Sequence, residues 1–269
     1  GSAALSWAPG AQLSDSPGLL FGPAPLYLNL SDAPDVVQLA GPNRRLVKEA
    51  LRWANESGFL QARLPGLAKL HELSGGGAVD ARTFGYRWGP RVNASGRIES
   101  AREPAELLLA ADPERIGVLA TACHATNEDR KDRTARMLAH ALQLAAERDR
   151  SGVRDRVLVL WDESWEPGIV GIVAGRLREQ MGVPAIIFGR HRGEQTWKGS
   201  GRSVGGYDLG AAVRSAVEAG LVLQGGGHHQ AAGLTVAGGL PVATASGAAG
   251  ASVPVAGLEN LRAWLNDRC

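Results

Sequence analysis

The chain of 269 residues is long enough for one large domain or two small ones. Hydrophobic residues make up 44% of it, so it can bury a substantial core, and its net charge of +2 does not by itself indicate nucleic-acid binding. Cys123 and Cys269 are too few for a disulfide framework or a zinc site, and no apolar run reaches the roughly 18 residues that span a bilayer. These properties favour a globular cytoplasmic protein without a membrane partner.

Arginine dominates the cationic side chains. Of the 29 lysines and arginines, four are lysines and 25 are arginines. The planar guanidinium suits phosphate better than an ammonium group does, but a GC-rich genome produces the same bias. Composition therefore leaves open whether the ligand carries phosphate.

The first half of the chain predicts an irregular start followed by helices. Residues 1–25 are rich in Gly, Pro, Ser and Ala without a period, which is typical of an irregular arm. Helices are expected over Arg44–Asn55 and Leu60–Leu73, and Ser74–Gly77 ends the second of them. A short helix is expected over Glu103–Ala111.

A long helix is expected to begin at Asp112 and to run to about Asp149. Asp112 is a good N-cap, and Pro113 suits the first helical position. The ends of this segment are apolar on one face, whereas its middle, His124–Arg136, is almost wholly polar. A helix that is polar all round is typical of a solvated connection between domains, so this helix is predicted to bridge two domains.

The last third alternates strands and helices, which indicates an α/β layer with a parallel or mixed sheet. Residues 237–257 contain little besides Gly, Ala, Ser, Val and Pro and predict a mobile surface loop. The predicted elements in chain order are a strand at Val157–Trp161, a helix at Pro167–Met181, a strand at Ala185–Phe188, a helix at Tyr207–Leu221, a strand at Gly233–Val236 and a helix at Leu258–Asn266.

The segment Pro90–Arg97 predicts a loop that carries Arg91, Asn93 and Arg97 among small residues. Such a loop is able to bind a phosphate through a guanidinium fork. Pairing of the arginines with nearby carboxylates such as Glu99 is equally well supported.

The segment Trp165–Gly175 predicts a turn from a strand into a helix. Backbone N–H groups near Gly168 would attract phosphate at the start of that helix. Close packing of the helix on the sheet, through Gly171 and Gly175, explains the same glycines and is the favoured interpretation.

The segment Trp197–Ser203 alternates cations and a hydroxyl with glycines. In a strand, Lys198, Ser200 and Arg202 would project to one face, which would form a track for phosphates. A solvated edge strand is an equally supported interpretation.

The segment Gly225–Gly233 presents two histidines after three glycines. Glycine lets the backbone approach a ligand closely, and His228 is able to donate to a phosphate or a scissile oxygen. A structural histidine is the alternative, but the surrounding Gly-Gly-Gly and Ala-Ala-Gly favour a functional one.

In this order, the four segments resemble the DHH/DHHA1 phosphoesterase superfamily and, within it, the RecJ-type single-strand DNA exonucleases. Gly-Gly-His-x-x-Ala-Ala-Gly at Gly226–Gly233 is the DHHA1 signature. The more RecJ-like motifs are Arg-x-Asn-Ala-x-Gly-Arg at Arg91–Arg97, Trp-x-Pro-Gly-Ile-Val-Gly-Ile-Val-Ala at Trp165–Ala174 and Lys-Gly-Ser-x-Arg-Ser at Lys198–Ser203. The resemblance runs from about Leu26 to Leu265.

The resemblance implies an α/β fold in which a DHHA1-type lobe, with a mixed sheet and flanking helices, is joined by a long bridging helix to the helical tail of a DHH lobe. The expected boundaries are an irregular leader at 1–25, the C-terminal remnant of the DHH lobe at 26–111, the bridging helix at 112–150 and the DHHA1 domain at 151–269.

The activity that the resemblance implies is 5′→3′ hydrolysis of single-stranded DNA with Mn²⁺ or Mg²⁺, in DNA repair and recombination. His228 would be the catalytic residue contributed by this chain. The implied phosphate contacts are Arg91, Asn93, Arg97, Gly168, Ser200, Arg202, Gly226 and Gly227. Two alternatives stay open: a phosphodiesterase for short RNA or cyclic dinucleotides, and a non-catalytic lobe that binds single strands.

The chain departs from the family at its metal ligands. Neither Asp-His-His nor Asp-x-Asp occurs in it, and Asp35 is the one metal ligand that the resemblance retains. One carboxylate cannot hold a two-metal centre. The isolated chain is therefore expected to be inactive and to bind no metal productively, with a separate or missing DHH catalytic lobe as a partner. Glu166 stands where the family usually has histidine.

Overall fold

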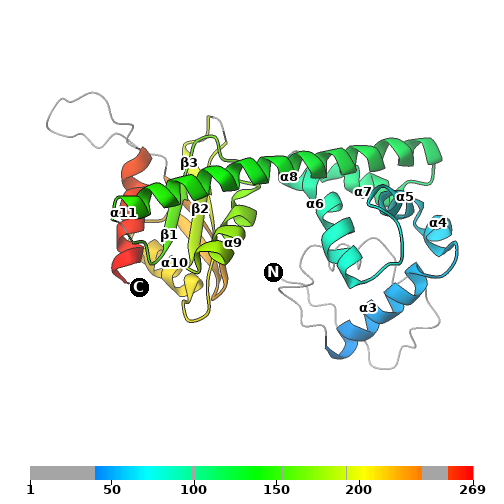
Figure 1. Cartoon of the computed structure of the whole chain (residues 1–269), viewed down its shortest axis with the longest axis horizontal. Helices are drawn as coiled ribbons and strands as arrows, with labels where there is room; N and C mark the ends of the chain where they lie inside the picture. Colours follow the sequence, from blue (N-terminus) through cyan, green and yellow to red (C-terminus); the bar gives the residue numbers. More distant parts are fainter. Residues whose placement is uncertain (1–39, 99–100, 153, 192, 238–253, 269) are drawn as a thin grey trace. The chain divides into compact units, whose positions relative to one another are not determined.

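The computed structural model describes residues 40–98, 101–152, 154–191, 193–237 and 254–268. The predicted arm at 1–25, Asp35 and residues 238–253 of the predicted loop at 237–257 lie outside these residues. The chain divides into two compact units, one up to Asp129 and one from Arg130 onward. The boundary falls within the long helix α8 (Pro113–Arg150), drawn in green in Figure 1. No helix of the described part is long and apolar enough to cross a membrane.

The first unit is helical and packs around one apolar cluster. Its fully buried side chains include Leu67, Leu70, Trp88 and Leu107. Gly66 allows close packing, because a Cβ there would lie 2.0 Å from the Leu107 carbonyl oxygen. The elements that precede α8 are α3 (Gly41–Ala54), α4 (Phe59–Arg63), α5 (Pro65–Leu73), the π-helical turn η1 (Thr83–Trp88), α6 (Gly89–Ile98) and α7 (Arg102–Leu109).

Two expectations for this unit were wrong. The single helix predicted over Leu60–Leu73 is broken at Leu64, whose φ of −140° is not helical, because the proline that follows disfavours the α conformation there. The loop predicted at Pro90–Arg97 is helix α6, which continues directly from η1. Pro90 thus lies inside a continuous helical run, where it cannot donate to the preceding turn, and the wider π-helical turn η1 comes directly before it.

The second unit is built on a five-stranded sheet in the order β1-β2-β3-β5-β4. β1 and β2 are parallel, and the other neighbours are antiparallel. The sheet is therefore mixed, as expected. The strands are β1 (Leu158–Trp161), β2 (Ala185–Gly189), β3 (Thr196–Arg202), β4 (Gln224–His228) and β5 (Ala231–Ala237).

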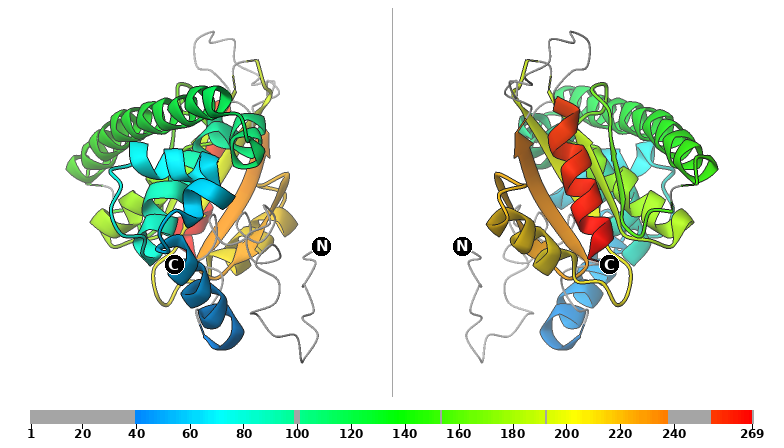
Figure 2. Two further views of the ribbon diagram at one scale, coloured as in Figure 1. Left: turned by 90° about the vertical axis from the view of Figure 1, so that its right-hand side faces the viewer. Right: turned by 90° about the vertical axis from the view of Figure 1, so that its left-hand side faces the viewer.

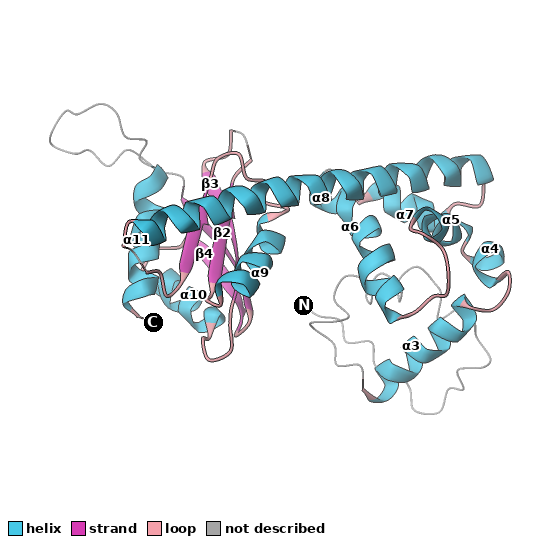
Figure 3. Cartoon of the chain, viewed as in Figure 1, coloured by secondary structure: helices cyan, strands magenta, loops and turns pink. Residues whose placement is uncertain are grey.

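Helices flank both faces of this sheet (Figure 3). On one face, α9 (Val170–Met181) and the second half of α8 pack against Leu158, Leu160 and Ile187. On the other face, α10 (Leu209–Glu218) and α11 (Pro254–Asp267) pack against a cluster that includes Ile186 and Leu234. Figure 2 shows α11, in red, lying across its face of the sheet. β1 and β2 are buried on both faces, whereas all of β4 is exposed.

β4 was not among the strands expected from the sequence. The segment pairs with β5 along its whole length, from Gln224 opposite Thr235 to His228 opposite Ala231. Of its glycines, Gly225 serves helix packing, because a Cβ there would lie 2.6 Å from Val213 Cγ1 of α10. β5 begins only three residues after His228 and pairs with β4. The hydrogen bonds between these two strands offset the low strand propensity of glycine.

The ends of three helices also differ from the expected ones. α9 begins at Val170 rather than Pro167, because residues 166–169 form a turn in which the Ile169 N–H donates to the Glu166 carbonyl at 2.9 Å. α10 is shorter than predicted and is capped by Asp208, whose carboxylate accepts from the Ala211 N–H at 2.8 Å. α11 begins at Pro254, earlier than expected.

Neighbouring glycines of β4 make a matched test of this packing. We predict that Gly227→Ala lowers the free energy of unfolding by about 1–3 kcal/mol, because its Cβ would lie 2.2 Å from the Ala231 carbonyl oxygen and 2.6 Å from Ala232 Cα. Gly226→Ala is expected to change it by no more than about 0.5 kcal/mol, since no atom lies within 4 Å of its Cβ position. Urea unfolding of the two variants measures the difference; equal losses would contradict this register.

Candidate nucleic-acid interface

One face of β3, β5 and β4 carries polar side chains and bare glycines. Alternate residues of a strand share a face, and residues opposite each other in a ladder share it too. One row across the three strands consists of Ser200, Gly233 and Gly226. A second row consists of Arg202, Ala231 and His228. We call this face the polar strip. Its nine positions are Lys198, Ser200, Arg202, Gln224, Gly226, His228, Ala231, Gly233 and Thr235.

The polar strip continues the sheet face on which α9 lies. Ser200 is paired with Ile187, which belongs to the apolar cluster beneath α9. A Cβ at Gly171 of α9 would lie 2.9 Å from Ser200 Oγ and 3.4 Å from Arg202 Nη2. The missing side chain at Gly171 therefore leaves room for Ser200 and Arg202 beside the first turn of α9.

The floor of the strip beyond β3 is open. No atom lies within 4 Å of the Cβ positions of Gly226 and Gly233, and both residues are exposed. The backbone of β5 and β4 is consequently accessible to a ligand at these two points. The remaining glycines of β4, Gly225 and Gly227, belong to the opposite face and to strand packing. Of the two glycines of β4 expected to contact phosphate, Gly226 lies on the strip and Gly227 does not.

The strip is cationic. None of its nine positions is acidic, whereas Lys198 and Arg202 each bring a positive charge. Arg202 Nη1 donates to Ser200 Oγ at 3.1 Å and to the Gly201 carbonyl at 2.9 Å, which holds the guanidinium along β3. Lys198 Nζ lies 3.4 Å from Thr235 Oγ1, on the neighbouring strand. Hydroxyl, guanidinium and ammonium donors thus follow one line, a pattern suited to a chain of phosphates.

His228 lies at the end of β4 and is exposed. Its Nδ1 accepts from the Gln230 N–H at 3.3 Å, within the turn that leads into β5. In the neutral ring this contact leaves the proton on Nε2, which becomes a donor. His229 lies next to it, with ring centroids 5.8 Å apart, but outside the strand. His228 is therefore a hydrogen-bond donor at the edge of the polar strip.

The other expected phosphate contact of this unit, Gly168, is half-buried in the turn before α9. The residue of that motif that approaches Ser200 and Arg202 is Gly171, which the sequence reading assigned to packing alone. The packing interpretation is compatible with the structure, because the absence of a side chain at Gly171 leaves space for the side chains of Ser200 and Arg202.

Three further expected contacts lie in the first unit, on α6. Arg91 is only 7% exposed, and burial lowers the pKa of its guanidinium. Its Nε donates to His124 Nδ1 at 3.0 Å and its Nη1 to the Arg87 carbonyl at 2.7 Å. Nη2 lies 3.7 Å from a carboxylate oxygen of Glu128. Arg91 thus ties α6 to α8 within this unit.

The structure says less about the other expected phosphate contacts and about the expected metal ligand. Asn93 is half-buried on α6. The backbone of Arg97 belongs to the same helix, and Asp35 lies outside the described residues. Within the described ranges, no group of three or more His, Cys, Asp or Glu side chains is arranged to hold a metal ion. Cys123 is buried, which raises the pKa of its thiol to about 11 and disfavours the reactive thiolate.

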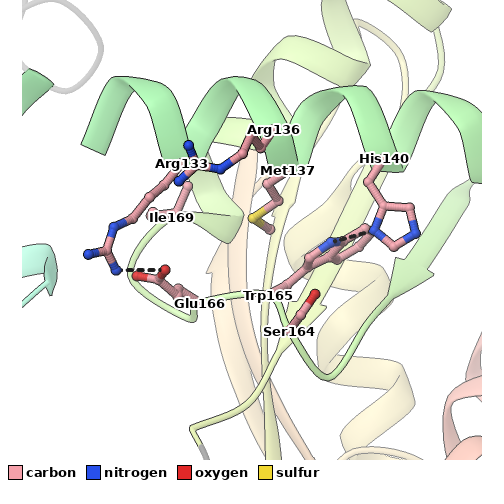
Figure 4. Close-up of a pocket in the computed structure, with 8 residues that line it drawn as sticks. All are labelled: Arg133, Arg136, Met137, His140, Ser164, Trp165, Glu166 and Ile169. Carbon is pink, nitrogen blue, oxygen red and sulfur yellow. Dashed lines mark hydrogen bonds and ion pairs between the residues drawn. The ribbon is translucent and has the colours of Figure 1, made fainter. Parts of the chain in front are cut away.

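A pocket that was not expected from the sequence lies beside α8 in the second unit (Figure 4). Arg133, Arg136, Met137 and His140 line it, and they recur at helical spacing on one side of α8. This spacing was a usable signal, but the polarity of residues 124–136 suggested solvent on all sides. Thr134, by contrast, is only 2% exposed, so the expectation of a wholly solvated middle was wrong.

Known proteins match this chain in sequence and in fold. Residues 154–245, which contain the whole sheet, match the family model described as the DHHA1 domain. The chain is 36% identical over 214 residues to the single-stranded-DNA-specific exonuclease RecJ of Dickeya dadantii, an alignment that covers 77% of this chain and 36% of that protein. Against the RecJ of Bacillus subtilis it is 31% identical over 204 residues, or 75% of this chain and 25% of that protein.

A solved structure of a RecJ protein is also similar to this chain in fold. The crystal structure of RecJ from Thermus thermophilus in complex with Mn²⁺ matches with a TM-score of 0.71 at 27% identity, over 91% of this chain and 32% of that one. The chain thus spans between about a quarter and a little over a third of the length of these relatives.

Proposed function

The chain is a RecJ-type, DHHA1-containing segment, and we propose that its polar strip binds the backbone of single-stranded DNA. The observation that carries the proposal is the line of donors on β3 beside an uncovered, glycine-floored sheet face. Ser200 and Arg202 would donate to phosphate oxygens, and the strand would lie against Gly226 and Gly233, where no Cβ protrudes.

Binding by the strip would be independent of base sequence. None of its nine positions is Phe, Tyr or Trp, so it lacks the aromatic platforms on which bases stack in many single-strand-binding proteins. Contacts with phosphates position a strand without reading it. The preference for single strands is supported by the relatives, which are single-stranded-DNA-specific exonucleases.

In the complete enzyme, we infer, this segment holds the strand while a metal-bearing DHH lobe hydrolyses it. The solved relatives are complexes with Mn²⁺ and Mg²⁺, but the described residues do not fit a two-metal centre. Asp35 is proposed as the one ligand from this chain. On this proposal, the isolated segment is a binding lobe without nuclease activity. Its catalytic lobe is a partner or another part of the same protein. The complete enzyme acts in the cytoplasm in DNA repair and recombination.

His228 is proposed to donate from Nε2 to an oxygen of the scissile phosphate, where negative charge develops. Its exposure and its place at the edge of the cationic strip support this role. Gly168, Asn93 and Arg97 remain proposed backbone contacts. Arg91 is also kept as a proposed phosphate contact, but its inward hydrogen bonds favour positioning of α6 as its main role.

The salt dependence of binding tests the strip. If Lys198 and Arg202 neutralise about two phosphates, the log–log slope of affinity for an unstructured oligonucleotide against salt is near −1.4, from roughly −0.7 per phosphate. We predict that Arg202→Ala reduces the slope to about −0.7, while Arg214→Ala, an exposed arginine on α10, leaves it unchanged. Fluorescence anisotropy at several salt concentrations measures both. A slope unaffected by Arg202→Ala would show that DNA binds elsewhere.

The role of His228 is testable in the complete RecJ-type enzyme. Losing one donor to a developing oxyanion typically costs about 10²–10³ in rate, so His228→Ala is expected to lower kcat by that factor with little change in DNA affinity or Tm. His229→Ala is the matched control, because its side chain lies outside the strand ladder, and it should have little effect. A loss of Tm that parallels the loss of activity, or equal effects of the two substitutions, would contradict the assignment.

A further inference from the structure

A pocket of about 300 Å³ lies between α8 and the residues that lead into α9, and it shares no residue with the polar strip. Figure 4 shows two linked pairs of side chains at opposite ends of it, with Met137 between them. Its lining consists of Arg133, Arg136, Met137 and His140 from α8, and Ser164, Trp165, Glu166 and Ile169 from the facing segment.

One end of the pocket carries excess positive charge. Arg133 Nη1 donates to Glu166 Oε1 at 2.9 Å, so these two charges compensate each other. Arg136 is exposed, and no ion pair or hydrogen bond joins it to another described residue. This end therefore offers the Arg136 guanidinium, which no described residue binds, on the same side of α8 as Arg133. Guanidinium groups bind phosphoryl oxygens through charged hydrogen bonds.

The other end offers neutral hydrogen-bonding groups. The Trp165 Nε1–H donates to His140 Nδ1 at 3.2 Å, and the two rings meet edge to face with centroids 5.5 Å apart. This contact leaves Nε2 of the neutral imidazole as a donor. The Ser164 hydroxyl donates a hydrogen bond to an Asp162 carboxylate oxygen, so Ser164 Oγ still has lone pairs that accept from a ligand. The stretch between the two ends is apolar, with the Met137 thioether and the Ile169 side chain.

We propose that this pocket binds a small organic phosphate monoester of the nucleoside monophosphate type. The phosphoryl group lies at Arg136 and Arg133, the body of the ligand packs on Met137 and Ile169, and its polar far edge meets His140 and Ser164. The volume is at the lower end of the range for small-molecule sites, about 300–1,000 Å³. It suits a single nucleotide rather than a strand, which separates this site from the one proposed for DNA.

Calorimetric titration of the chain tests the proposal with three probes: thymidine 5′-monophosphate, thymidine and inorganic phosphate. The nucleotide should bind more tightly than phosphate, and thymidine should show no measurable binding. Arg136→Ala should weaken nucleotide binding about tenfold or more, in line with loss of a charged hydrogen bond. Glu166→Gln should strengthen it several-fold, because it removes the carboxylate that competes for Arg133.

A second readout locates the ligand. The indole ¹H–¹⁵N signal of Trp165, assigned with Trp165→Phe, should shift on titration because this N–H bonds to His140 at the far end of the pocket. The controls Arg202→Ala and Arg214→Ala should leave nucleotide affinity unchanged. Arg136 is exposed, so its substitution is expected to leave the melting temperature intact.

Three results would overturn the proposal. They are no binding of the nucleotide at millimolar concentration, equal affinity for nucleotide and inorganic phosphate, and binding that Arg202→Ala abolishes while Arg136→Ala does not. The last result would place the nucleotide on the polar strip and would leave the proposed DNA-binding function standing. Failure of the strip to bind DNA, in turn, would leave the pocket result unaffected.

Discussion

The proposed function depends on one constraint: helices bury one face of β3, β5 and β4 but leave part of the other face open. β3 and β5 place Trp197, Leu234 and Val236 on the side that α10 and α11 bury. Because side chains alternate along a strand, Lys198, Ser200 and Arg202 of β3 then lie on the other side. On that side α9 approaches β3, and Gly226 and Gly233 have open space above them. A sheet with one buried face must present its remaining side chains to water or to a ligand, and here those side chains are donors.

Glycine has three different physical roles in this unit. Gly171 of α9 yields space to Ser200 and Arg202, whereas Gly225 lets α10 approach β4. Gly226 and Gly233 have no atom within 4 Å of their Cβ positions, so packing does not explain them, and they are the positions at which the proposed DNA strand would approach the sheet. A motif that looks uniform as a string of letters therefore separates into structural and ligand-facing positions once the ladder is known. The distinction follows from the two-residue period of the strand.

Local patterns predicted much of the fold. The buried runs at β1 and β2, the Asp112–Pro113 start of α8 and the common face of Lys198, Ser200 and Arg202 were all readable from the sequence, because each depends on residues close in the chain. β4 was not, since three glycines carry no strand signal without the β5 ladder. The Pro90–Arg97 segment looked like a loop because proline and small residues are typical of loops, whereas burial of Trp88 and Val92 in the core holds it in a helix. The pocket beside α8 required tertiary contact with Trp165 and Glu166.

The polar strip is tested most directly by ¹H–¹⁵N NMR of the chain during titration with a short unstructured DNA strand. The account predicts that the amide signals of Ser200, Gly226 and Gly233 and the ring signals of His228 shift or broaden together, and that those of α10 and α11 on the opposite face stay in place. Changes confined to α10 and α11, or to the helices of the first unit, with Gly226 and Gly233 unaffected, would contradict it.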